Sequence, residues 1–563
     1  MIGLVTATAA GRRLAALIHD AWPDGTTVHS GPVAAQVATA WAGSDALVCF
    51  LATGATVRLL APLLSDKHTD PGVVCVDEAG THAIALLGGH AGGANALAYR
   101  IAEVLGARPV VSTATDATGG TALDSFGADL GFRLPDPSPV AALTRALLDG
   151  EPVTLDSDAT WPVPPLSTVD DAPRRIAVTD RSATEADLVY RPPSLVVGVG
   201  ASRGVSQDEV ENLVREGLTE AGLAPESVRA IATADVKADE PGILACAGKY
   251  GWPLRTYPAA ELSTVPVPNP SETVRAAVGT PSVAEAAALL AAREAGRDAE
   301  LVLPKRSSAM ATVAIARLTP RGRLTIVGLG PGAPDLRAPR ATQALRRASF
   351  VVGLDQYVDQ IRYLLRPGTT VVASGLGAEE ERARTAVELA TQGNAVALIG
   401  SGDAGLYAMA SPALQLAGPD VDVEVVPGIT AALAAAARLG APLGHDHAYL
   451  SLSDLHTPWP VIVRRLRCCA EADLVLCLYN PRSARRTAQF DEAVAILAQY
   501  RDPDTPVGIV RDASRPGERV ILTTLKELQP GSVDMRSMVL VGSSRTVVRA
   551  GRLVTPREYR WLS

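Results

Sequence analysis

Three short apolar segments in the second half of the chain each end in a glycine-bearing turn. They are Leu324–Val327 before GLGPG at 328–332, Ala395–Ile399 before GSGDAG at 400–405, and Val423–Val426 before PGIT at 427–430. Such segments read as buried strands of an α/β sheet, and turns that follow parallel strands gather at one edge of it. We therefore predict one ligand crevice at these strand ends, where glycine lets the backbone approach a ligand closely.

The first turn also satisfies the pattern of a dinucleotide-binding loop, with Ala333 in its last position. Two features oppose that interpretation. Pro331 removes an amide N–H that a diphosphate would need, and Asp355 lies 27 residues after Gly328 instead of about 20. A nicotinamide-dependent oxidoreductase stays open as an alternative for this half.

The length of 563 residues predicts several domains, because one hydrophobic core rarely grows so large. The fold class expected is multidomain α/β. We place an N-terminal α/β domain at 1–134, a Pro-rich middle segment with linkers at 135–193 and a second α/β domain at 194–318. Two further α/β subdomains are expected at 322–440 and 441–563, after a boundary at Pro320-Arg321.

Charge and composition exclude several classes of partner. The net charge is −8 and no basic tract occurs, so we expect no nucleic-acid partner. No apolar run approaches about 18 residues and no signal peptide is recognisable, so we expect no membrane segment. The six cysteines form no CxxC pair, which fits a reducing cytoplasm.

Five ordered blocks carry a resemblance over residues 322–563: GLGPG, SGDAGLYAMA, VVPGITAALAAAARLGAPLGHD, SLSDLHTPWPVIVRRL and LYNPRSARR. Together they resemble the tetrapyrrole methylase family, and within it the ring-contracting precorrin-3B carbon-17 methyltransferases. The resemblance implies two subdomains with S-adenosylmethionine between them, a tetrapyrrole substrate and a homodimer. It implies cofactor contacts at Pro331, Ser401, Gly402, Asp403, Leu406, Thr430, Ala431, Asn480 and Ala513, and substrate contacts at Gly328, Gly330, Gly332 and Arg482.

Ring contraction also needs a base and hydrogen-bond donors for a developing oxyanion. The segments GHDH at 444–447 and SLSDLH at 451–456 offer His445, Asp446, Asp454 and His456. An alternative is that Ser453 and Asp454 only cap a helix that begins near Trp459. Nearby arginines suit a substrate rich in carboxylates, although solvated helix faces would also explain several of them, including Arg485 and Arg486.

The first half of the chain concentrates polar residues in SDKHTD at 65–70, GGHAGGAN at 88–95 and STATD at 112–116. Glycines on both sides of His90 would let a ligand approach it, so His90 could act as an acid or base. We expect no metal site, because His68, His82 and His90 lack the spacing of metal ligands.

These blocks, with GVGASRG at 198–204 and ADVKADEPG at 234–242, resemble the cobalt-precorrin-5A hydrolase family over residues 1–318. That family opens a lactone and releases acetaldehyde. The resemblance suggests that His90 shares proton transfer with Asp66 or Asp116, and that Arg203, Lys237 and Glu240 bind substrate edges. The chain departs from the family at Gly88 and Ala201, where serine and cysteine are frequent.

Two interpretations of the first half remain open, an enzyme or a non-catalytic binding module beside the methyltransferase. If both halves are enzymes, fusion raises the local concentration of activities on neighbouring intermediates. The resemblance implies that any cobalt arrives inside the substrate, which would be cobalt-factor III or cobalt-precorrin-3, with precorrin-3B as the competing substrate.

Overall fold

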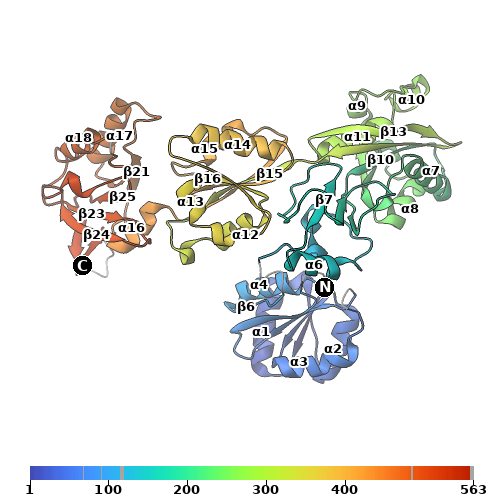
Figure 1. Ribbon diagram of the computed structural model, residues 1–563, viewed down its shortest axis with the longest axis horizontal. Helices are drawn as coiled ribbons and strands as arrows, with labels where there is room; N and C mark the ends of the chain where they lie inside the picture. The colour runs from blue at the N-terminus through green and yellow to red at the C-terminus, as the bar shows by residue number, and fades with distance from the viewer. Residues whose placement is uncertain (67–68, 90–91, 114–118, 484–485, 558, 560–563) are drawn as a thin grey trace. The chain divides into compact units, whose positions relative to one another are not determined.

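A computed structural model describes residues 1–66, 69–89, 92–113, 119–483, 486–557 and 559 (Figure 1). The chain divides into two compact units. Unit 1 comprises 1–321 with 366–369, and unit 2 comprises 322–365 with 370–563. Within the described residues, no helix combines the length and the apolar character that crossing a bilayer requires.

Unit 1 begins with a six-stranded sheet in the order β2-β1-β3-β4-β5-β6. Its strands are β1 Ile2–Thr6, β2 Thr26–Val28, β3 Ala46–Phe50, β4 Gly72–Val76, β5 His82–Leu87 and β6 Arg108–Val110. Its helices are α1 Ala9–Ala21, α2 Val33–Gly43, α3 Thr53–Leu60 and α4 Ala94–Leu105. Every residue of β3 is buried, because Val48 packs on the α1 and α4 side and Leu47 on the α2 side. Such two-sided cover explains the continuous apolar run of β3.

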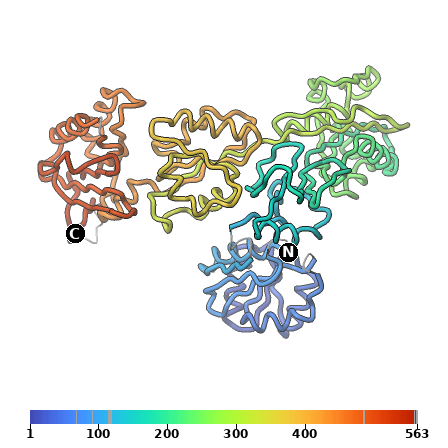
Figure 2. The backbone as a smooth tube through the Cα atoms, in the orientation of Figure 1, coloured from blue at the N-terminus to red at the C-terminus, as the bar shows by residue number. Residues whose placement is uncertain are grey.

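The middle segment folds more regularly than its composition suggests. The short strands β7 Val153–Ser157, β8 Arg174–Val178 and β9 Leu188–Tyr190 form a parallel sheet beside α6 Val140–Leu148. They share a core that includes Leu143, Ile176 and Tyr190. The expectation of a Pro-rich middle segment with linkers at 135–193 was therefore incomplete, because this range also contains a small sheet. Figure 2 traces the connections between its short strands.

The second α/β domain of unit 1 has the strand order β12-β11-β10-β14-β13. Its strands are β10 Leu195–Ala201, β11 Val228–Ala234, β12 Leu254–Tyr257, β13 Asp298–Ser307 and β14 Ala311–Thr319. Its helices are α7 Gln207–Glu220, α8 Pro241–Tyr250, α9 Ala259–Leu262, α10 Glu272–Val278 and α11 Ala284–Ala295. Because β10 and β11 are parallel neighbours, the GASRG and ADVKADE segments that follow them lie at the same sheet edge.

Unit 2 begins with an all-parallel sheet in the order β17-β16-β18-β15-β19. The strands are β15 Gly322–Gly328, β16 Phe350–Leu354, β17 Thr370–Ser374, β18 Ala395–Gly400 and β19 Val421–Val426. Figure 1 shows α14 Glu379–Thr391 and α15 Ala410–Leu416 on one face, and α12 Pro339–Arg347 with α13 Asp355–Asp359 on the other. The three strands that precede the glycine turns are adjacent, so their turns share one edge.

The second lobe of unit 2 has a mixed sheet in the order β21-β22-β25-β23-β24 and a small sheet β20-β27-β26. The strands are β20 Gly440–Ala441, β21 His447–Ser451, β22 Val475–Tyr479, β23 Pro506–Arg511, β24 Arg519–Thr524, β25 Ser537–Val541, β26 Val547–Arg549 and β27 Arg552–Val554. The helices are α16 Ala431–Leu439, α17 Trp459–Glu471 and α18 Ala488–Leu497. Helices α17 and α18 cover one face of the larger sheet, and α16 packs on the other.

Candidate functional site

The three glycine turns of unit 2 meet in van der Waals contact. Gly330 and Gly402 form an antiparallel bridge, with N–H···O distances of 3.0 and 2.8 Å. A Cβ added to Gly428 would lie 2.1 Å from the Gly402 carbonyl oxygen and 2.7 Å from that of Gly328. Glycine is required at this meeting point because no side chain would fit between the turns.

Asp403 uses both carboxylate oxygens to brace these turns. Oδ1 accepts the Gly405 N–H at 2.9 Å and Oδ2 accepts the Gly428 N–H at 3.0 Å. The side chain therefore joins the second turn to the third. Its role in the geometry is to hold the backbone groups of both turns in place.

Thr430 and Ala431 follow the third turn, and Thr430 is the residue before α16. The Thr430 hydroxyl does not cap the helix and instead pairs with the Tyr479 hydroxyl at 2.5 Å. Tyr479 also accepts the Ala432 N–H at 3.2 Å. Leu406, Ala431 and Ala513 lie in one apolar cluster with this tyrosine, so three residues expected to contact the cofactor share one wall.

Tyr479→Phe is predicted to lower the affinity for S-adenosylhomocysteine about tenfold, since the buried Ala432 N–H and Thr430 hydroxyl would lose their partner.

Burial raises the pKa of Tyr479 to about 12. The neutral hydroxyl therefore stabilises the fold below a pH of about 10, and this contribution is lost as pH rises toward 12. Calorimetric titration between about pH 6 and 9 should give a flat profile for this group. The exposed Tyr500→Phe variant is the control, and equal affinities of the two variants would contradict the assignment.

Arg515, which the sequence did not single out, connects the second lobe to the first two turns. Its Nε donates to the Pro331 carbonyl at 2.7 Å, and its Nη2 donates to the Ser401 hydroxyl at 2.7 Å. A Cβ on Gly332 would come within 2.5 Å of the Arg515 side chain. Ala513 belongs to the same loop after β23, so this loop covers the turns that hold Pro331 and Ser401.

Asn480 and Arg482 lie in the loop that directly follows β22. Asn480 has a positive φ of 49° and donates to the Ser451 hydroxyl at 3.1 Å. Arg486 is buried and donates to the Asn480 and Pro481 carbonyl oxygens of this loop and, at 2.7 Å, to the Leu452 carbonyl oxygen after β21, so it joins the two loops. Arg482 lies 3.6 Å from Asp491.

The four candidates for the ring-contraction base lie on exposed loops at either end of β21. His445 accepts the Asp446 N–H at 2.8 Å, and Asp454 accepts from Gln489 at 2.9 Å. His456 is exposed. The alternative that Ser453 and Asp454 cap the next helix is wrong, because Pro458 precedes α17 and that end has no side-chain cap.

The dinucleotide alternative lacks its defining geometry. Two backbone N–H groups of the first turn do not point toward a diphosphate, because that of Leu329 donates to the Gly400 carbonyl and that of Gly330 donates to the Gly402 carbonyl. Helix α12 begins only at Pro339, seven positions after Gly332, so the turn does not lead directly into a helix N-terminus as a dinucleotide-binding loop does.

In unit 1, the structure brings together the three residues expected to bind substrate edges. Glu240 is 1% exposed and accepts the Gly204 N–H at 2.8 Å through Oε1. Its Oε2 lies 3.8 Å from both Lys237 Nζ and Arg203 Nη1 and accepts no hydrogen bond in the described structure. Arg203 also pairs with the exposed Asp239 at 2.7 Å and thereby lowers the pKa of that carboxyl.

The glycine-rich segment near His90 packs against the start of β4. A Cβ on Gly72 would lie 2.0 Å from the Gly92 carbonyl oxygen, and Gly88 has a φ of 63° with Gly72 and Gly92 beside it. The left-handed backbone and close packing explain a glycine at 88. His90 and Asp116 lie outside the described residues, and Asp66 accepts the Asp70 N–H at 2.8 Å through its backbone carbonyl.

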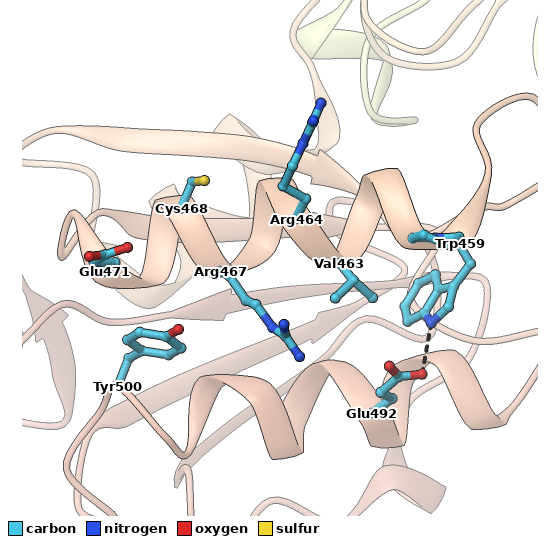
Figure 3. A pocket seen from close by; sticks show the side chains of 9 residues that line it. Trp459, Val463, Arg464, Arg467, Cys468, Glu471, Glu492 and Tyr500 are labelled. Carbon is cyan, nitrogen blue, oxygen red and sulfur yellow. Dashed lines mark hydrogen bonds between the residues drawn. The ribbon is translucent and has the colours of Figure 1, made fainter.

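A groove of about 520 Å³ lies on α17 and α18. Figure 3 shows the side chains that line it. Trp459, Arg467 and Glu492 line it, and the Trp459 indole donates to Glu492 at 2.7 Å. No residue of the glycine turns lines this groove, so it does not belong to the site at the strand ends.

Comparison with known families assigns three segments of the chain. Residues 323–529 match the family described as "Tetrapyrrole (Corrin/Porphyrin) Methylases". Residues 195–316 match "Cobalamin synthesis G C-terminus", and residues 35–116 match "Cobalamin synthesis G N-terminal".

Individual relatives are similar to this chain over less than half of its length. A "Probable cobalt-factor III C(17)-methyltransferase" of Salmonella typhimurium is 44% identical over 239 residues, which are 42% of this chain and 99% of the relative. A "Cobalt-factor III methyltransferase" of Priestia megaterium is 40% identical over 247 residues, 43% of this chain, and the match spans only 46% of that longer protein. The crystal structure of the methyltransferase CobJ is 38% identical over 42% of this chain and 100% of its own, with a TM-score of 0.40.

Proposed function

We propose, from the premise that the chain belongs to the tetrapyrrole methylase family, that unit 2 methylates carbon 17 of a corrin precursor and contracts its ring. The observation that carries this proposal is the meeting of Gly328, Gly402 and Gly428 at one sheet edge, closed by Arg515. The substrate proposed is cobalt-factor III, which both curated relatives carry in their names, and precorrin-3B is the alternative.

The residues present fit S-adenosylmethionine, whose sulfonium group supplies an electrophilic methyl for in-line displacement. Leu406, Ala431 and Ala513 offer an apolar wall. Backbone groups braced by Asp403, with the Ser401 and Thr430 hydroxyls, offer polar partners for the ends of the ligand. Because transfer depends chiefly on positioning, the rigidity of the three turns is the contribution of this chain.

For ring contraction we propose that a base from the 445–456 segment removes the hydroxyl proton of the extruded carbon. His445, Asp446, Asp454 and His456 remain the candidates. Substrate contacts are proposed at Gly328, Gly330, Gly332 and Arg482, and cofactor contacts also at Pro331, Gly402 and Asn480. We propose that the enzyme acts as a homodimer.

For unit 1 we propose hydrolysis of the lactone of cobalt-precorrin-5A with release of acetaldehyde. Families described as cobalamin synthesis proteins match two of its segments, and Arg203, Lys237 and Glu240 meet at one sheet edge. Arg203 and Lys237 would bind substrate carboxylates, and His90 with Asp66 or Asp116 would transfer protons. A binding module without catalysis would use the same two cations, Arg203 and Lys237, to hold the substrate, but it would release no acetaldehyde.

Mass spectrometry of the products tests both proposals. Purified protein is incubated with a trideuteromethyl-labelled donor and either cobalt-factor III or precorrin-3B. We expect one labelled methyl group on a contracted ring. Acetaldehyde is trapped separately as its hydrazone after incubation with cobalt-precorrin-5A. Tight binding of NAD with none of S-adenosylhomocysteine would refute the assignment of unit 2.

A further inference from the structure

Unit 2 buries four arginine side chains among its described residues: Arg337, Arg382, Arg486 and Arg501. A guanidinium carries five N–H donors and stays charged, so burial is costly unless acceptors surround it. The hydrogen bonds of each buried arginine therefore show whether its charge serves the fold or awaits a ligand.

Three of the four are well supplied with acceptors. Arg382 donates to the Ser374 hydroxyl and the Gly375 carbonyl. Arg486 donates to three carbonyl oxygens and lies 3.8 Å from Asp454. Arg501 likewise donates to three carbonyl oxygens and pairs with Asp473 at 3.1 Å. Through these hydrogen bonds, the three side chains stabilise loops and helix ends.

Arg337 is 8% exposed and differs from the others. Among the described residues, its side chain makes one hydrogen bond, from Nη1 to the Tyr363 hydroxyl at 3.1 Å. Its Nε is buried without a partner, and no carboxylate of the described residues lies within ion-pair distance. The guanidinium lies 5.9 Å from the centre of the Tyr363 ring. A neutral phenol does not balance a buried positive charge.

The position of Arg337 links this charge to the glycine turns. The turn that ends at Leu336 packs on Gly330, where an added Cβ would lie 2.8 Å from the Leu336 carbonyl oxygen and 3.8 Å from the Arg337 Cα. Tyr363, which accepts the hydrogen bond of this buried cation, is itself 66% exposed.

We infer that Arg337 and Tyr363 form a carboxylate-binding site beside the first glycine turn, and that an acidic side chain of the macrocycle occupies it. The inference rests on the proposed function, because that function supplies a ligand rich in carboxylates. A carboxylate could form a bidentate pair with the free donors of Arg337, and Tyr363 could turn its hydroxyl to the same group. Arg337 is thus a residue for substrate positioning and specificity.

The test uses the full-length protein and uroporphyrin III, a tetrapyrrole with a carboxylate on every peripheral chain. Arg337→Gln is expected to weaken uroporphyrin binding at least about tenfold in a fluorescence titration. Its affinity for S-adenosylhomocysteine should stay unchanged, as should binding of the methyl ester of uroporphyrin III. Arg340→Gln is the matched control, because Arg340 lies on α12, is 71% exposed and pairs with Glu424.

Thermal melting separates binding from a structural role. Arg337→Met should leave the Tm of the ligand-free protein equal or higher, because it removes an unbalanced buried charge, whereas loss of a structural arginine would lower it. If Arg337→Gln fails to fold, Arg337→Lys decides. It keeps the charge without the planar fork and should bind uroporphyrin several-fold more weakly.

Three results would overturn the inference. Equal uroporphyrin affinity of the wild type and the Arg337 variants would refute it while leaving the proposed function intact. A loss confined to S-adenosylhomocysteine would assign the site to the methyl donor instead of the macrocycle. A wild-type protein that binds no tetrapyrrole would remove the proposed function and this site together.

Discussion

Gly428→Ala is expected to weaken binding of S-adenosylhomocysteine at least about 100-fold. The new methyl group would lie 2.1 Å from the Gly402 carbonyl oxygen and 2.7 Å from that of Gly328, so it meets backbone on both sides. Neither neighbour can turn away as a flexible side chain would. Overpacking of this kind costs about 3 kcal/mol when backbone has to move, which corresponds to about two orders of magnitude in affinity.

Isothermal titration of wild type and variant gives the two dissociation constants. Gly418→Ala is the control, because nothing lies within 4 Å of a Cβ at that position in the same unit. It should bind like the wild type. If Gly428→Ala also bound like the wild type, the three turns would not form the donor site, and the proposed methyltransferase would lose its main support.

The elements of the sheets could be predicted well from the sequence. The strand expected from Leu324 to Val327 lies within β15, Gly322–Gly328, and the strand expected from Ala395 to Ile399 lies within β18, Ala395–Gly400. Buried strands are continuous apolar runs, and Ser206 caps α7 with its side chain, so local signals were sufficient. The adjacency of the three glycine turns could also be predicted, because turns that follow parallel strands gather at one edge of the sheet.

The closure of the site could not be predicted in this way. Arg515 meets Ser401 across 114 positions of sequence and Pro331 across 184, and no local pattern records such pairs. The only available signals were weak: Tyr479 directly precedes the Asn480-Pro481 turn, and Arg515 stands beside Pro516-Gly517. Arg337 gives no signal in sequence, because an arginine in a connection between two elements is ordinarily solvated.

Glu240→Ala is expected to lower acetaldehyde release about 30- to 150-fold and to leave methyl transfer unchanged. Glu240 is 1% exposed, holds the Gly204 N–H at 2.8 Å and lies 3.8 Å from Lys237, which is 13% exposed. Its removal leaves the Gly204 amide without its acceptor and the largely buried Lys237 without its counter-ion. A charged hydrogen bond of this kind contributes about 2–3 kcal/mol, and that range sets the expected loss.

Two further variants separate charge from hydrogen bonding at this position. Glu240→Gln keeps an acceptor for Gly204 and removes the charge, so its rate should fall between those of the wild type and Glu240→Ala. Asp239→Asn should change the rate by no more than about threefold, since the pair of Asp239 with Arg203 is exposed and such pairs contribute little.

The rate is measured as kcat/KM for acetaldehyde formation at several pH values, with methyl transfer recorded on the same preparation. A loss in both activities would indicate general unfolding instead of a local effect. Full acetaldehyde release by Glu240→Ala would place hydrolysis elsewhere, because the arrangement that Glu240 holds at this edge would then be dispensable. Absence of acetaldehyde from the wild type itself would favour the binding module, in which Arg203 and Lys237 hold a substrate that another protein opens.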